Sequence, residues 1–345
     1  MRVVMSGTGG AAGWPEPGCR CASCAGAAAG GGRGPSGVVV DAGLRLDLAA
    51  GTAAPGAGGG VVREIPGGWD VTGGDGERLL CAREAGAVPE PPADAAPYDY
   101  AVLDLLGDPA QLGLLRKSGL VTGSTAVALG FADHRAASER ELAELGGFWD
   151  VQVMRDGGEM EQRRYGQKWR RVLLVGGARS GKSERAEARV AAEPDVTYVA
   201  TGPAVPGDAE WAARVAAHRA RRPAWWRTVE TTDLAGILAG QQGTLLIDGI
   251  GTWLAAVMGE CGVWDDAPGA RQRLAARTTQ LVRSWRETRY HVVAVSDETG
   301  FGVVPETPAG RVFRDELGRL NQALARESEL TEFVLAGRVM PLPLW

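Results

Sequence analysis

The segment from Gly176 to Ser183 constrains the fold of this chain more than any other feature of the sequence. It reads G-G-A-R-S-G-K-S and matches the pattern G-x-x-x-x-G-K-[ST] of a phosphate-binding loop. The short apolar run 172–175 precedes it, and a segment rich in Ala, Glu and Arg follows at 182–193. A buried strand, a glycine-rich loop and a helix in this order surround phosphate oxygens with backbone N–H groups and a helix N-terminus. We therefore predict a nucleoside triphosphate site in the second half of the chain.

Strand-like and helix-like segments alternate through this second half. Short apolar runs predict strands at 172–175, 196–199, 244–247, 291–295 and 333–335. Longer segments of mixed polarity predict helices at 182–193, 209–220, 271–288 and 313–326. Parallel strands need such crossover helices, so the alternation predicts an α/β domain with a mostly parallel, doubly wound sheet.

Length and local composition divide the chain into two domains. With 345 residues it exceeds the size of most single domains. Residues 156–169 are polar and charged and are interpreted as a linker. This leaves a first domain at 1–155, whose many glycines indicate loops, and a phosphate-loop domain at 170–345.

Charge and hydropathy argue against two classes of protein. The formal net charge is -5 and Lys and Arg are spread along the chain, so no nucleic-acid partner is expected. No apolar run approaches the roughly 20 residues of a membrane helix, and the apolar residues 1–5 end too early for a signal peptide. We expect a cytoplasmic protein without a membrane span.

Lys182, Ser183 and Asp248 are the candidate phosphate and metal residues. Lys182 can reach the β- and γ-phosphates, and the hydroxyl of Ser183 can bind Mg²⁺. Asp248 ends the predicted strand 244–247, at the sheet edge where ligands bind in open α/β folds, and its carboxylate can hold the same Mg²⁺. The alternative for Asp248 is a turn or helix-capping residue before Gly249.

The segment after a later predicted strand narrows the class of phosphate-loop protein. A regulatory GTPase would carry an N-K-x-D motif there, whereas residues 295–298 read V-S-D-E. This difference favours a transferase over a nucleotide switch. The alternative is a nucleotide-binding regulatory module or a single-activity kinase.

Two histidines lie in the second domain. His291 begins a predicted strand and is interpreted as structural. His218 lies in the basic segment 214–222, where arginines can neutralise a triphosphate while a neutral imidazole attacks it. From spacing alone, His218 is either such a nucleophile or part of a solvated helix face.

Further blocks of sequence follow the loop in a fixed order. They are Tyr198–Thr201, Asp208–Glu210, Arg214 with His218–Arg219, Arg222–Pro223, Trp226–Glu230, Gly302–Glu306, Arg314–Asp315 and Asn321–Ala325. Together with the loop, these blocks resemble the adenosylcobinamide kinase / adenosylcobinamide-phosphate guanylyltransferase family of cobalamin biosynthesis. The resemblance extends over about residues 171–340.

This resemblance implies two reactions on one site. ATP or GTP first phosphorylates adenosylcobinamide, and GTP then guanylylates a histidine at the position of His218, from which GMP passes on to give adenosylcobinamide-GDP. The implied nucleotide contacts, with catalytic Lys182 and the Mg²⁺ ligands among them, are Gly176, Gly177, Ala178, Arg179, Ser180, Gly181, Lys182, Ser183, Ala200, Thr201, Gly202, Arg219, Ala220, Arg221, Arg222, Glu230 and Asp248. Glu230 and Asp248 either contact guanine N–H groups or bind a metal, and Glu230 is alternatively a solvated strand end. The resemblance also implies a homo-oligomer, commonly a trimer.

One stretch departs from the family pattern. The family often has an Asn-Glu pair before Val-Gly, whereas this chain has Asp297 and Glu298 before Thr299 and Gly300. A carboxylate in place of the amide removes a hydrogen-bond donor from this side chain.

The first domain resembles a different family. Residues 5–15 and 19–24 are similar to the start of metallo-β-lactamase-fold phosphodiesterases, and 38–41 with 44–47 resemble the paired strands that follow. Such enzymes need several histidines for their dimetal centre, but His134 is the only histidine of this domain. The resemblance therefore implies a truncated, degenerate α/β domain of this fold without hydrolytic activity.

A structural zinc site is a second implication of that resemblance. Cys19, Cys21 and Cys24 can offer three thiolates, and tetrahedral zinc needs a fourth ligand. In the phosphodiesterases the second of two histidines spaced three apart completes this site; here Phe131 stands at the first position and His134 at the second. The alternative is three free or buried thiols and a surface histidine.

Overall fold

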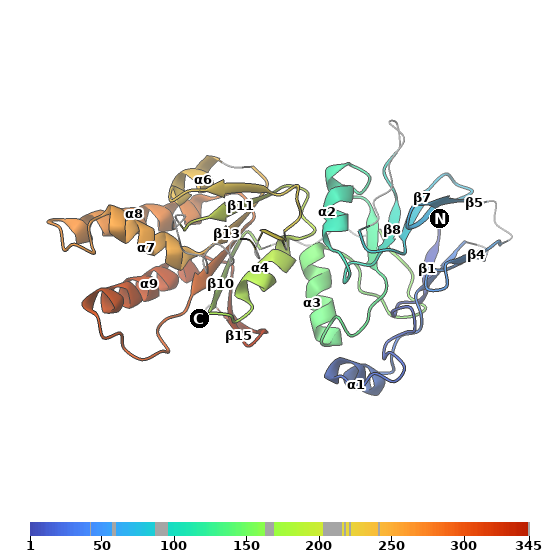
Figure 1. Cartoon of the computed structure of the whole chain (residues 1–345). Helices are drawn as coiled ribbons and strands as arrows, with labels where there is room; N and C mark the ends of the chain where they lie inside the picture. The colour runs from blue at the N-terminus through green and yellow to red at the C-terminus, as the bar shows by residue number, and fades with distance from the viewer. Residues whose placement is uncertain are drawn as a thin grey trace. The chain divides into compact units, whose positions relative to one another are not determined.

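The computed structural model describes residues 1–41, 43–56, 60–86, 96–162, 169–202, 216, 219–220, 222–240 and 242–343. The chain divides into two units, which Figure 1 shows with their elements labelled. Unit 1 comprises Met1–Gln167 and Ala191–Pro194, and unit 2 comprises Lys168–Val190 and Asp195–Trp345. Each unit has its own sheets and its own apolar core.

Unit 2 is built on one seven-stranded sheet. In spatial order its strands are β12 (Arg227–Glu230), β11 (Val196–Ala200), β13 (Thr244–Asp248), β14 (Val292–Asp297), β10 (Arg171–Gly176), β15 (Leu330–Leu335) and β16 (Arg338–Leu342). The first six run parallel, and β16 pairs antiparallel with β15. The predicted parallel sheet is confirmed. The predicted strands do not include β12, which is polar, or β16, which contains Pro341; both are edge strands with largely exposed residues.

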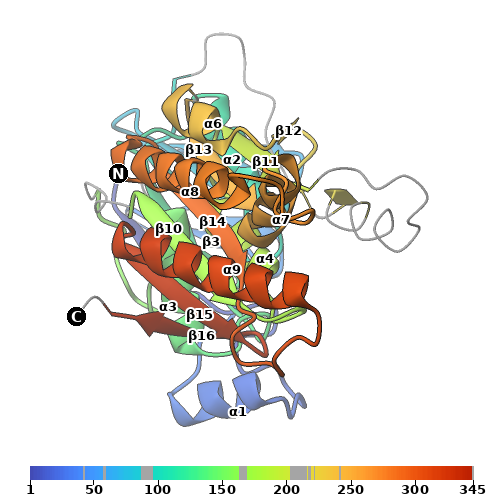
Figure 2. The same ribbon diagram turned by 90° about the vertical axis from the view of Figure 1, so that its left-hand side faces the viewer.

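Helices cover both faces of this sheet. Leu173 and Val175 of β10 pack in a core cluster with the helices α6 (Leu234–Gly240), α7 (Ile250–Glu260), α8 (Ala270–Glu287) and α9 (Pro308–Arg326). Val172 and Leu174 share the opposite cluster with α4 (Lys182–Val190). Figure 2 looks onto the face that α8 and α9 cover. Successive strand residues point to opposite faces, so an uninterrupted apolar run is what a strand covered on both sides requires.

Unit 1 contains two sheets. The first is antiparallel, with the order β1 (Val3–Gly7), β2 (Gly37–Val40), β3 (Leu44–Asp47) and β4 (Thr52–Ala54). The second has the order β5 (Val61–Ile65), β6 (Gly68–Thr72), β7 (Arg78–Ala82), β8 (Tyr100–Leu103) and β9 (Ala126–Leu129), antiparallel as far as β7 and parallel beyond it. Met5 and Leu46 of the first sheet share a core cluster with Val71 and Val102 of the second. The two sheets therefore pack face to face.

Helices lie against the other face of the second sheet. Leu80, Leu103 and Val127 of that sheet share a cluster with side chains of α1 (Ala22–Ala29), α2 (Ala110–Lys117) and α3 (Glu139–Trp149). Helix α3 begins after Ser138, whose hydroxyl accepts a hydrogen bond from the N–H of Glu141 at 3.2 Å. Unit 1 thus has a helical layer, a mixed sheet and an antiparallel sheet.

The segment 156–169, predicted to be a linker, begins inside unit 1. The carboxylate of Asp156 accepts hydrogen bonds from the N–H groups of Thr8 at 2.9 Å and Gly34 at 2.6 Å. Met160 is buried in the core that the two sheets share. The linker prediction is therefore wrong for the first residues of this segment. Polar composition does not reveal that a carboxylate is held by backbone donors far away in the sequence.

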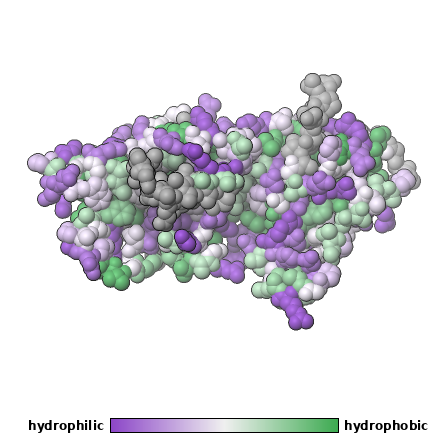
Figure 3. Space-filling view, viewed as in Figure 1, coloured by the Kyte–Doolittle hydropathy of each residue, from purple (hydrophilic) through white to green (hydrophobic). Residues whose placement is uncertain are grey.

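No helix in the described part of the chain is both long and apolar enough to cross a membrane. On the face of the molecule shown in Figure 3, hydrophilic and hydrophobic residues are intermixed. Apolar atoms make up much of any folded surface, so scattered hydrophobic residues are ordinary.

Candidate functional site

The loop Gly176–Ser183 joins β10 to α4 at the carboxyl edge of the parallel sheet. Two of its glycines are required by the backbone. A Cβ at Gly176 would lie 2.5 Å from the carbonyl oxygen of Val334, and Gly181 has a φ of +93° that other residues rarely adopt. Ser180 is buried, and its hydroxyl has no hydrogen-bond partner among the described residues. An unpartnered buried hydroxyl in such a loop fits a site that a ligand completes.

Lys182 is the first residue of α4, and its ammonium group contacts the loop. Nζ donates to the carbonyl oxygen of Gly177 at 3.0 Å and forms an ion pair with Oδ1 of Asp297 at 2.9 Å. The Lys182 side chain is only 12% exposed, so water screens these contacts weakly. This position suits a cation that holds phosphate oxygens entering the loop.

Asp248 ends β13 and contacts the last residue of the loop. The hydroxyl of Ser183 donates to Oδ1 of Asp248 at 3.3 Å, and the hydroxyl of Tyr198 donates to Oδ2 at 2.6 Å. The N-cap position of helix α7 is Gly249, so Asp248 precedes the cap and its two carboxylate oxygens contact Ser183 and Tyr198. Hydroxyl and carboxylate oxygens are the donors that Mg²⁺ prefers, so Ser183 and Asp248 fit this cation.

Residues 200–202 lie at the end of β11. Ala200 is the register partner of Asp248 in the neighbouring strand, so this segment starts beside the carboxylate. Thr201 is buried, and its hydroxyl donates to the carbonyl oxygen of Gly249 at 2.6 Å. The contact joins the ends of two neighbouring strands and shapes the edge of the sheet beside the loop.

The basic segment around residues 219–222 contacts the same edge of the sheet. Arg219 donates to Oε1 of Glu230, at the end of β12, at 3.1 Å, and both side chains are exposed. The guanidinium carbon of Arg222 lies 3.5 Å from the ring centroid of Tyr198. Ala220 is exposed. Two predicted site residues lie outside the described part of the chain, namely His218 and Arg221.

Comparison with known proteins decides the family of unit 2. Residues 172–342 match the family model of cobinamide kinase / cobinamide phosphate guanyltransferase. The bifunctional adenosylcobalamin biosynthesis protein CobP of Pseudomonas aeruginosa is 43% identical over 178 residues, which cover 50% of this chain and 96% of that protein. The chain belongs to the cobinamide kinase / cobinamide phosphate guanyltransferase family.

Two further relatives of this kinase and guanyltransferase support the same assignment. The bifunctional adenosylcobalamin biosynthesis proteins CobU of Salmonella typhimurium and of Escherichia coli are 36% and 34% identical, and each match covers 48% of this chain and 96% of the relative. Family membership makes the chain a transferase of cobalamin biosynthesis with kinase and guanyltransferase activities. The family match covers most of unit 2, and residues 1–171 lie outside it.

Sequence reasoning assigned no site role to two polar residues, Tyr198 beside Asp248 and Asp297 beside Lys182. Tyr198 lies within the apolar run 196–199, where a core role is the default interpretation. Asp297 ends β14, and the strand order places β14 between the strands that carry the loop and Asp248. A signal for Asp297 was present, because it lies two positions after the predicted buried strand 291–295, much as Asp248 follows the strand 244–247.

Unit 1 brings the predicted zinc ligands Cys19, Cys21, Cys24 and His134 together, with their ligand atoms all within 4.8 Å of one another. Nδ1 of His134 lies 3.7 Å from Sγ of Cys24 and 3.0 Å from Oε2 of Glu16. Burial raises the pKa of the Cys24 thiol to about 11, whereas a hydrogen bond from the N–H of Cys24 lowers the pKa of the Cys21 thiol. Three sulfurs and an imidazole nitrogen are typical donors of tetrahedral zinc, and a bound cation would stabilise the thiolates.

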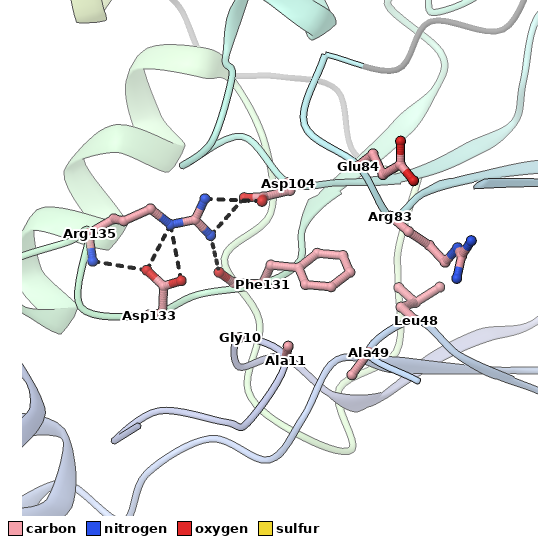
Figure 4. A pocket seen from close by; sticks show the side chains of 10 residues that line it. All are labelled: Gly10, Ala11, Leu48, Ala49, Arg83, Glu84, Asp104, Phe131, Asp133 and Arg135. Carbon is pink, nitrogen blue, oxygen red and sulfur yellow. Dashed lines mark hydrogen bonds and ion pairs between the residues drawn. The ribbon is translucent and has the colours of Figure 1, made fainter. Parts of the chain in front are cut away.

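A cavity of about 360 Å³ lies in unit 1 (Figure 4). The guanidinium of Arg135, in its wall, pairs with Asp104 at 3.0 Å and with Asp133 at 2.9 Å. Phe131 also lines the cavity and has a φ of +58°. The lining that the described residues provide contains no histidine, and His134 instead contacts the cysteines. Two of the acidic groups that line this cavity, Asp104 and Asp133, therefore share an ion pair with one arginine.

Proposed function

We propose that unit 2 carries out both reactions at the loop Gly176–Ser183. In the first, the γ-phosphoryl group of ATP or GTP passes to the aminopropanol hydroxyl of adenosylcobinamide. In the second, GMP passes from GTP through His218 to the cobinamide phosphate and gives adenosylcobinamide-GDP. The observation that carries the proposal is the convergence of Lys182, Ser183 and Asp248 at one edge of the sheet, in a chain of this family.

The loop and Lys182 supply the positive environment for the kinase step. Loop N–H groups and the N-terminus of α4 attract the entering phosphates, and Lys182 neutralises charge on the transferred group. Ser183 and Asp248 would hold Mg²⁺, which neutralises the β- and γ-phosphate oxygens when it is bound. Positioning and electrostatics contribute most of the rate enhancement in a reaction of this type.

His218 is the proposed nucleophile of the guanylyl transfer. An imidazole nitrogen attacks the α-phosphorus of GTP, and the bond from that phosphorus to the bridging oxygen breaks, which releases pyrophosphate. A phosphate oxygen of adenosylcobinamide phosphate then attacks the phosphoramidate, and the imidazole leaves. The contacts of nearby residues support this role, because Arg219 meets Glu230 and Arg222 meets Tyr198 at the carboxyl edge of the sheet.

Labelling with GTP that carries a radioactive α-phosphate tests the proposal. The wild-type chain should retain an acid-labile label, whereas His218→Ala should lose the label and still phosphorylate adenosylcobinamide. His291→Ala is the matched control and should label like wild type, because His291 precedes β14 at the amino end of the sheet. A wild-type chain that phosphorylates without labelling would favour a single-activity kinase, and nucleotide binding without turnover would favour a regulatory module.

The remaining nucleotide contacts and the assembly follow the family resemblance. The segment 200–202, residues 219–222 and Glu230 are proposed to contact the nucleotide, and the position of Ala200, Arg219 and Glu230 at the sheet edge supports this assignment. The proposed assembly is a homo-oligomer, a trimer as the resemblance implies. The molar mass of the full chain in solution tests this assembly.

For unit 1 we propose a structural zinc in a degenerate metallo-β-lactamase-like domain without hydrolytic activity. The cluster of three cysteines and His134 supports the zinc, and the pair of packed sheets supports the fold. The salt bridges of Arg135 support the loss of a dimetal centre, because a cation already occupies the position between Asp104 and Asp133.

A further inference from the structure

Asp297 ends β14 beside the phosphate loop and pairs with its lysine. Oδ1 of Asp297 lies 2.9 Å from Nζ of Lys182, and the two side chains are 39% and 12% exposed. The family pattern that this segment resembles has asparagine at this position, so the carboxylate of Asp297 departs from that pattern. Family membership alone does not explain why an acidic group lies next to the cation that is to hold phosphate.

Neighbouring elements hold Asp297 in this position. Gly176 is its register partner in β10, the adjacent parallel strand. The side-chain amide of Asn321 donates to the carbonyl oxygen of Asp297 at 3.0 Å, and the hydroxyl of Ser296 donates to Oδ1 of Asn321 at 2.5 Å. Gly251, in the first turn of α7, leaves room for the carboxylate, since a Cβ there would lie 2.7 Å from Oδ2 of Asp297. The carboxylate is therefore confined to the vicinity of the loop.

We propose that the carboxylate of Asp297 makes the loop select the magnesium complex of a nucleoside triphosphate over the free anion. This inference rests on the proposed binding of triphosphate at Lys182. A phosphate oxygen that bonds to Nζ comes within about 6 Å of the carboxylate, because both groups contact the same nitrogen. Asp297 is thus a positioning residue that the free triphosphate meets as a like charge.

The charge of the ligand decides how strongly Asp297 opposes it. Like charges at this separation repel each other in a partly desolvated site. A divalent cation on the phosphates cancels much of their negative charge, so the repulsion acts mainly on the free anion. Asparagine keeps the shape of the side chain and an acceptor oxygen for Lys182 but carries no charge. The carboxylate therefore disfavours free triphosphate much more than its magnesium complex.

Equilibrium binding of GMP-PNP, a non-hydrolysable GTP analogue, tests this inference. Calorimetry on the full chain measures the Kd of the analogue with and without Mg²⁺. The readout is the Kd without Mg²⁺ divided by the Kd with Mg²⁺. Buffers freed of metal supply the magnesium-free condition, because an added chelator would also remove a metal from the cysteines of unit 1. Asp297→Asn should lower the ratio about tenfold, through tighter binding of the free analogue.

Glu298→Gln is the matched control, since it removes the same charge one residue further along the chain. The carboxylate of Glu298 accepts a hydrogen bond from the N–H of Gly300, whereas the ion pair with Lys182 belongs to Asp297. This variant should keep the wild-type ratio. Asp297→Ser removes the charge with a smaller side chain and should shift the ratio in the same direction as Asp297→Asn. Circular dichroism confirms that each variant is folded before its constants are compared.

The outcomes separate this inference from the proposed function. An unchanged ratio in both folded Asp297 variants, or an equal shift of both constants, would overturn the inference. If wild type still labels His218 in that case, the guanylyltransferase proposal stands and the role of Asp297 alone is rejected. A wild-type chain that binds neither form of the analogue would overturn the triphosphate site at Lys182 together with the inference.

Discussion

The hydroxyl of Tyr198 donates a 2.6 Å hydrogen bond to Oδ2 of Asp248. Burial, and after it the charge of Asp248, raises the pKa of the Tyr198 phenol, so the phenol keeps its proton and remains a donor. The other carboxylate oxygen of Asp248 accepts from Ser183 at 3.3 Å. Tyr198 and Ser183 thus hold the carboxylate in one orientation, at the position proposed for Mg²⁺.

We expect Tyr198→Phe to raise the Mg²⁺ concentration for half-maximal kinase activity about tenfold, because a hydrogen bond to a charged group contributes roughly 1.5 kcal/mol. A magnesium titration at fixed GTP measures this change. Tyr290→Phe is the matched control, since Tyr290 lies before β14 at the opposite edge of the sheet. Identical titrations for the two variants would show that Tyr198 does not orient Asp248.

The metal content of the purified chain tests the cysteine cluster. We expect about one zinc per chain, lost in Cys24→Ser together with a lower unfolding temperature of unit 1, because a bound metal stabilises the folded state. Elemental analysis and thermal unfolding measure the two effects. Cys81→Ala is the control, since Cys81 is buried in β7 and is not part of the cluster. Equal zinc in Cys24→Ser and wild type would exclude Cys24 as a ligand.

Arg33 and Glu139 form a bidentate ion pair in unit 1. Nε of Arg33 donates to Oε1 at 2.8 Å and Nη2 donates to Oε2 at 2.6 Å. The side chain of Arg33 is 3% exposed and that of Glu139 is 31% exposed. The hydrogen bonds from Arg33 hold the pKa of Glu139 below its ordinary value. Such a carboxyl stabilises the fold above its unfolded-state pKa and loses this contribution as the pH falls through its folded-state pKa.

We expect Glu139→Gln to lower the free energy of unfolding by about 1 kcal/mol at neutral pH, a value that allows for solvent screening of the part-exposed carboxylate. The difference from wild type should shrink as the pH falls through the lowered folded-state pKa of Glu139, because the wild-type carboxyl then takes up its proton. Denaturant unfolding of unit 1 in the full chain, at a series of pH values, measures it. Glu144→Gln, at an exposed pair with Arg140 on α3, should have little effect. A difference that does not vary with pH would contradict the ion pair as its cause.

The loop Gly176–Ser183 and the five central strands of unit 2 could be predicted because their signals are local. Glycine spacing defines the loop, and uninterrupted apolar runs indicate strands that are covered on both faces. An edge strand such as β12 is not recognised by an apolar run, since its exposed residues need not be apolar. The structural role of Asp156 could not be predicted either, because it depends on hydrogen bonds from the N–H groups of Thr8 and Gly34, which are distant in sequence.

Residue identity and spacing were enough for the phosphate loop and for the grouping of Cys19, Cys21 and Cys24, which are local patterns. They were also enough for the family, whose blocks follow one another in a fixed order over about residues 171–340. Only the tertiary structure decided which side chains that are distant in sequence come into contact. Asp297 reaches Lys182 because β14 lies between β10 and β13, and His134 reaches Cys24 across 110 positions of sequence. Long-range packing selects the order and register of strands, so spacing along the chain does not specify which side chains meet at a sheet edge.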